Sequence, residues 1–144
     1  MKITLDAKAA LAAARAAKRT ASRNGKSMPV LHNIGITPTD DGVVFRATDL
    51  ETWAEFELDA TIEGERQGYL VDAAMLVSTM AGFKPKKGEV VTLDSQDGHV
   101  KIGSIKLATV EEIAFPERPQ DLDPEESGEL AGVTLREHLE AVVY

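Results

Sequence analysis

The sequence predicts an α+β domain in which two helices pack on one face of a mainly antiparallel sheet. The stretch 43–58 alternates apolar and polar residues with a period of two, which is typical of a half-buried strand, and shorter stretches on either side repeat the pattern. Two further segments, 6–19 and 72–83, have the composition and apolar spacing of helices. Helices of this kind must cover the apolar face of the sheet.

The alternation within 43–58 changes phase. Apolar residues occupy odd positions up to Ala47 and even positions from Leu50 onward. A continuous strand would turn its apolar face outward at that point. We therefore expect a bulge or a tight bend at residues 48–51 that keeps both halves facing one core.

The remaining elements follow from capping and turn residues. Asp6 and Asp72 are good N-caps for the two helices, and the second helix places Leu76, Met80 and Phe83 at core spacing. Hairpin turns are expected at 40–42, 63–68 and 97–98, where Gly follows or accompanies Asp or Glu. The other predicted strands or extended stretches are 2–5, 30–37, 68–71, 89–93, 99–102 and 104–110.

The C-terminal part of the sequence changes character. Residues 115–127 are rich in proline and acid and lack periodicity, which is typical of a linker. We expect one domain at 1–119, an acidic linker at 120–128 and the start of a second, truncated repeat at 129–144, because 133–135 (VTL) and the helical run after it echo 3–5 (ITL) and the first helix. A capping box of Thr134 and Glu137, or a chance likeness, is the alternative.

Composition excludes several classes of protein. The chain has no cysteine, which excludes disulfides and thiol catalysis. No apolar run is long enough to span a membrane, and the N-terminus lacks the apolar segment of a signal peptide, so we expect a cytoplasmic protein. The phosphate-binding loop, the nucleophile motif and the zinc spacing are all missing, so no enzymatic activity, cofactor or metal is expected.

The net charge of −8 conceals an uneven distribution. Residues 1–30 contain seven Lys and Arg but one acidic residue, whereas the rest is strongly acidic. The first helix has a basic stripe, the loop after it adds two cations, and a second cluster follows the second helix: Lys8, Arg15, Lys18, Arg19, Arg23, Lys26, Lys84, Lys86 and Lys87. Such a stripe is either a solvated helix face or one charged side of the molecule.

These segments, in this order and spacing, resemble the N-terminal domain of the bacterial DNA polymerase III β subunit, the sliding clamp. The likeness covers about residues 1–119. The matching stretches are 1–4 (MKIT), 28–31 (MPVL), 48–51 (TDLE), the helix at 71–83, the strand at 105–110 and 115–116 (FP).

The resemblance implies a function and partners. Clamps of this family close a ring around duplex DNA, with helices lining the hole, so the nine cations would face the phosphates without reading bases. It also implies a subunit interface at Met75, Thr79, Ile105 and Leu107, although these residues can equally fill the domain's own core. In this family the polymerase binds later domains that are absent from this sequence, and we expect the same for the clamp loader.

Two other classes stay open on the sequence alone. One is a small acidic module that binds protein through its sheet edge, with the basic helix as a solvated face. The other is a small enzyme whose site is invisible in the sequence. Salt-dependent binding to DNA of any sequence would distinguish a clamp from both.

Overall fold

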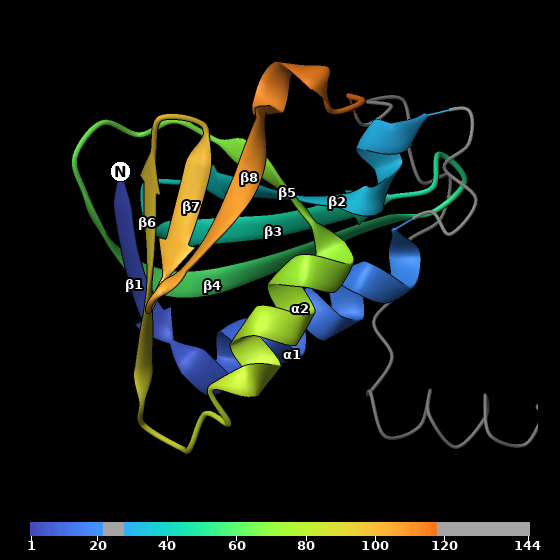
Figure 1. Cartoon of the computed structure of the whole chain (residues 1–144). Helices are drawn as coiled ribbons and strands as arrows, with labels where there is room; N and C mark the ends of the chain where they lie inside the picture. Colours follow the sequence, from blue (N-terminus) through green and yellow to red (C-terminus); the bar gives the residue numbers. More distant parts are fainter. Residues whose placement is uncertain (22–27, 118–144) are drawn as a thin grey trace, which may run out of the picture.

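The computed structural model describes residues 1–21 and 28–117 of the chain (Figure 1). The described part contains two α-helices, α1 (Ala7–Thr20) and α2 (Ala73–Gly82), and two short 3-10 helices, η1 (Pro29–His32) and η2 (Glu112–Ala114). Its strands are β1 (Lys2–Asp6), β2 (Asn33–Pro38), β3 (Gly42–Thr48), β4 (Trp53–Glu63), β5 (Tyr69–Asp72), β6 (Val90–Gln96), β7 (His99–Ile102) and β8 (Ile105–Glu111).

All strand pairs are antiparallel, as predicted, but the strands close into a barrel in the order β1-β4-β3-β2-β5-β8-β7-β6 rather than forming one open sheet. Two strands cause the closure by changing partner along their length. β4 pairs first with β3 and then, from Ala60, with β1. β8 pairs first with β7 and then, from Thr109, with β5. The barrel therefore consists of two sheets that share these strands.

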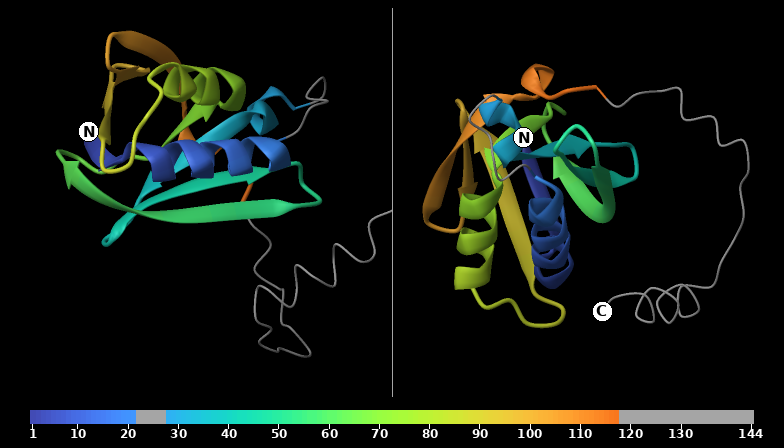
Figure 2. Two further views of the ribbon diagram at one scale, coloured as in Figure 1. Left: turned by 90° about the horizontal axis from the view of Figure 1, so that it is seen from below. Right: turned by 90° about the vertical axis from the view of Figure 1, so that its right-hand side faces the viewer.

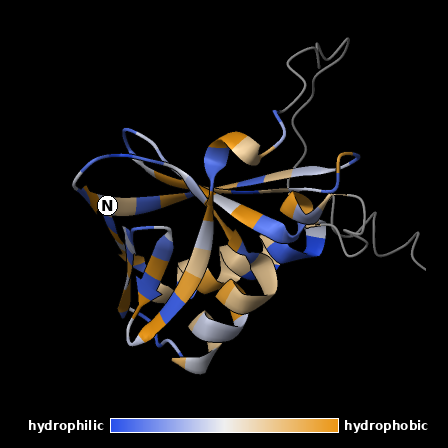
Figure 3. Cartoon of the chain, turned by 45° about the horizontal axis from the view of Figure 1, so that its top comes forward, coloured by the Kyte–Doolittle hydropathy of each residue, from blue (hydrophilic) through white to orange (hydrophobic). Residues whose placement is uncertain are grey.

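The helices lie side by side in the wedge between the two sheets (Figure 2). They run antiparallel. The end of α1 lies beside the start of α2, and Arg15 and Ala74 line one groove there. Inward-facing residues of the strands, among them Ile3, Ile36 and Phe45, are fully buried against the helices. Hydrophilic and hydrophobic residues alternate along the strands, as a half-buried sheet requires (Figure 3).

The phase change near Thr48 is a complete hairpin, so the expectation of a bulge or bend within one strand was wrong. β3 and β4 pair with each other, with Phe45 opposite Phe56. The Asp49 carboxylate accepts hydrogen bonds from the backbone N–H groups of Glu51 and Thr52, and Leu50 has a φ of 78°. The turn reverses the chain, and this reversal brings both apolar sets to one core.

Two other segments differ from the expectation. Residues 29–32 form the 3-10 helix η1 rather than an extended strand, and Leu31 of this helix is buried.

Phe115, predicted to open the linker, is also buried. Its ring lies edge-on to Trp53 at 6.4 Å between centroids, and the Arg46 guanidinium lies 5.8 Å above it. Arg46 also pairs with Glu112, so residues 112–115 are attached to the outer face of β3 and β4.

In the described residues no helix is long and apolar enough to cross a membrane. The proposed linker and the truncated repeat, residues 120–144, lie outside the described residues.

Candidate nucleic-acid interface

The basic stripe is carried by α1, which begins where the sequence predicts. The Asp6 carboxylate accepts a hydrogen bond from the Ala9 N–H at 2.7 Å and so caps the helix. Ala10, Ala14 and Ala17 are fully buried on the opposite face. Because alanine has a single-carbon side chain, this face can pack close to β3, β4 and α2, and the long cationic side chains remain outside.

All four described cations of the stripe are exposed: Lys8, Arg15, Lys18 and Arg19. None of the four forms an ion pair with another residue in the described part of the chain. Lys18 and Arg19 lie in the last turn, where the carbonyl ends of the helix favour positive charge. Arg23 and Lys26, the two cations predicted in the following loop, lie outside the described residues.

A groove with a volume of about 330 Å³ lies between the end of α1 and the start of α2. Arg15, Lys18 and Arg19 line it from one helix, and His32 of η1 contributes an imidazole. The acidic residue in the groove, Asp72, uses its carboxylate to cap α2 by accepting from the Met75 N–H at 2.8 Å. Sequence reasoning missed His32, because its position depends on the fold and no local pattern marks it.

The second basic cluster, Lys84, Lys86 and Lys87, is also exposed and follows the end of α2. The fold brings the loop that carries it to the beginning of α1, where the Ala7 N–H donates to the Glu89 carbonyl oxygen at 2.8 Å. The two clusters, far apart in the sequence, are therefore attached to the same pair of helices.

Three acidic residues lie on the outer face of β4, away from the helices. Along β4, Glu55, Glu57 and Asp59 are exposed, while the residues between them pack towards the core. The two basic clusters therefore lie on and beside the helices, whereas these three carboxylates lie on the outer surface of the barrel.

The structure divides the four predicted interface residues into two pairs. Met75 of α2 and Ile105 of β8 are exposed, with 54% and 41% of their surface accessible. Thr79 and Leu107 are buried, and Leu107 belongs to the hydrophobic core. In this domain Met75 and Ile105 can contact a neighbour directly, whereas Leu107 contributes to folding. The interface itself stays a prediction.

Comparison with known proteins finds similarity at the level of three-dimensional structure. No family model and no curated protein sequence matches the chain. Solved structures do match. The chain is 26% identical to Caulobacter crescentus pol III beta, with a TM-score of 0.71 over 84% of this chain and 33% of that one. For the DNA polymerase III beta subunit of Thermotoga maritima the identity is 21% and the TM-score 0.71, over 88% and 34%.

A third match is the DNA polymerase III subunit beta of Pseudomonas aeruginosa, at 18% identity and a TM-score of 0.70 over 83% of this chain and 32% of that one. The chain thus spans about a third of the length of the structures it matches. The matched share corresponds to one domain. This chain therefore has the fold of a single domain of the DNA polymerase III beta subunits, the sliding clamps.

Proposed function

We propose that this chain is the N-terminal domain of a DNA sliding clamp, a non-enzymatic processivity factor that encircles duplex DNA and tethers the replicative polymerase. The observation that carries the proposal is the separation of charge described above: exposed cations on the helix side, without ion pairs in the described part of the chain, and carboxylates on the outer face of β4. Similarity to solved sliding clamps supports the same conclusion.

A clamp that slides needs contacts to phosphates and none to base edges, because a base-specific contact would hold it at one sequence. Long, exposed lysine and arginine side chains meet this requirement, and the groove at Arg15, Lys18 and His32 is where we expect a phosphate to approach most closely. The carboxylates on the outer face of β4 would repel DNA from that side of the ring.

A single domain does not enclose DNA, so the proposal requires partners. Further clamp domains or protomers would complete the ring, and the polymerase and the clamp loader would bind through those other domains. Such a protein would act in the cytoplasm of a bacterial cell, and this location is part of the proposal.

Replacing Arg15 and Arg19 with alanine tests the DNA-facing surface. We expect weaker binding to duplex DNA and a salt dependence whose log–log slope falls by up to ~0.9 for each phosphate that the variant no longer neutralises. Fluorescence anisotropy with two duplexes of unrelated sequence, across a range of salt concentrations, measures both quantities. The matched control is Lys101→Ala with Lys106→Ala, which removes two exposed cations from β7 and β8.

The control pair should bind like the wild type. If the helix variant keeps the wild-type affinity and slope, or if binding depends on base sequence, the surface is misassigned. Absence of any salt-dependent DNA binding would favour the protein-interaction module instead.

The subunit contact has its own test, in the ring-forming protein that contains this domain. Ile105→Ser is expected to weaken ring assembly, seen as smaller species by sedimentation velocity, while the domain melts at its usual temperature, because Ile105 is exposed. Leu107→Ser should unfold the domain, because Leu107 is 4% exposed and lies in the core. Intact rings with Ile105→Ser would show that Ile105 lies outside the interface.

A further inference from the structure

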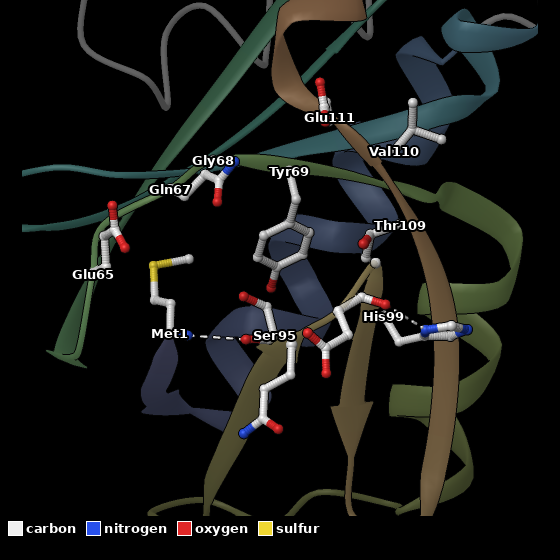
Figure 4. A pocket seen from close by; sticks show the side chains of 13 residues that line it. Met1, Glu65, Gln67, Gly68, Tyr69, Ser95, His99, Thr109, Val110 and Glu111 are labelled. Atoms are coloured by element: carbon white, nitrogen blue, oxygen red, sulfur yellow. Dashed lines mark hydrogen bonds between the residues drawn. The ribbon is translucent and has the colours of Figure 1, made fainter.

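A second site lies at the end of the barrel opposite the helices. It is an open cleft of about 360 Å³, lined by residues from the starts of β1 and β5, the β6–β7 hairpin and the end of β8 (Figure 4). Both helices follow the C-terminal ends of β1 and β5, and the cleft lies at the N-terminal ends of the same two strands. The cleft is therefore separate from the basic surface.

Tyr69 is central to this cleft. Its side chain is 5% exposed and projects from β5 between the other lining residues, toward β6 (Figure 4). Its hydroxyl is buried and has no hydrogen-bond partner among the described residues. Nearly all buried polar atoms in proteins are paired, so an unpaired hydroxyl in a cleft indicates that a group from outside completes it. Burial raises the pKa of the Tyr69 hydroxyl above its ordinary value, so the group is neutral, and a neutral tyrosine hydroxyl can both donate and accept a hydrogen bond.

The charges of the lining residues indicate which charge a bound group would carry. Glu65, Asp97 and Glu111 bring three carboxylates to the cleft. The positive group beside them, the amino group of Met1, already donates to the Ser95 carbonyl oxygen at 2.9 Å. A cation would therefore be attracted to this cleft, and an anion would be repelled.

The geometry also restricts the kind of cation. No three acidic or histidine side chains among the described residues are arranged to hold a metal ion. A hydroxyl oxygen with free lone pairs, in a cleft that is also lined by separate carboxylates, suits a group with several N–H donors.

We propose that this cleft binds an organic cation, a primary ammonium or guanidinium group, with one N–H donating to the Tyr69 oxygen and the carboxylates of the lining attracting the charge. The group can come from a lysine or arginine side chain of a peptide, or from a free polyamine. This proposal does not depend on the clamp function, because it uses a different end of the barrel and charge of the opposite sign.

Titration followed by the backbone amide signals of Gly98 and Thr109 tests the proposal. The probes are the capped peptide acetyl-Gly-Lys-Gly-amide and spermidine, which distinguish the two sources, and the same peptide with acetyllysine as the neutral control. We expect saturable shifts with at least one cationic probe, reduced by added salt, and none with the neutral peptide. Equal responses to the charged and neutral peptides would overturn the proposal.

Variants separate recognition from non-specific attraction. Tyr69→Phe removes one oxygen that has no described partner, so folding should be retained, and affinity should fall about tenfold. Glu111→Gln should weaken binding about two- to fivefold, as expected for an exposed charge. Glu57→Gln, on the outer face of β4, should have no effect. Wild-type affinity in Tyr69→Phe would show that the cleft is not a cation site. The same conclusion would follow if an ordered water were the sole partner of the hydroxyl and no probe gave saturable shifts.

Discussion

Replacing Phe45 with alanine is expected to lower the free energy of unfolding by about 3–5 kcal/mol. The phenylalanine side chain is 0% exposed and lies in the core between β3 and the helices, so its removal leaves a cavity that surrounding residues fill only in part. A loss of that size is a large fraction of the stability of a domain of this length. Urea denaturation followed by circular dichroism measures it.

Phe56 provides the matched control, because it is the cross-strand partner of Phe45 and is only partly buried. Phe56→Ala removes the same atoms, and its effect should be clearly smaller because part of this ring already faces solvent in the folded domain. Equal effects would mean that the two rings are buried to the same extent in solution, which would contradict the packing of the β3–β4 hairpin.

Gly42→Ala is expected to destabilise the domain by about 2–3 kcal/mol, the upper part of the range for a forced overlap in a packed region. A Cβ at residue 42 would lie 2.2 Å from the backbone carbonyl oxygen of Leu58 and 3.1 Å from its carbonyl carbon. These atoms belong to the paired strand β4, so relief requires separation of the Gly42–Asp59 pair. Thermal melting of the variant measures the loss.

Gly82→Ala is the control for that substitution. Gly82 is the last residue of α2 and has open space where a Cβ would be added. Alanine is a better helix former than glycine, so this variant should be neutral or more stable, by up to about 1 kcal/mol. If Gly42→Ala melts like Gly82→Ala, the close approach of β3 and β4 at Leu58 is incorrect.

Local chemistry predicted much of the fold. Asp6 and Asp72 cap their helices as expected, because an N-cap depends on one carboxylate and a backbone N–H three residues later. The turn at 97–98 and strand β7 also lie where they were predicted. The hairpin at Asp49 was misread, because a change of phase in an alternating pattern is the same whether the chain bends or reverses. Only strand pairing distinguishes the two cases.

The parts that sequence could not predict are non-local. Barrel closure depends on β4 and β8 exchanging partners midway, and no residue within either strand specifies the second partner. The exposure of Lys8 and Arg15 followed from helical spacing alone. The burial of Leu107 beside exposed Ile105, and the unpaired hydroxyl of Tyr69, depend on which strands meet at the two ends of the barrel.

The position of β1 in the barrel has a consequence for synthesis on the ribosome. β1 emerges before the other strands of this domain, yet its two neighbours are β4, at residues 60–63, and β6, at residues 90–94. Each contact closes a long loop, which has an entropic cost before any hydrogen bond forms. The second neighbour does not exist until most of the domain has been translated. β1 must therefore stay unpaired on that side until β6 has left the exit tunnel.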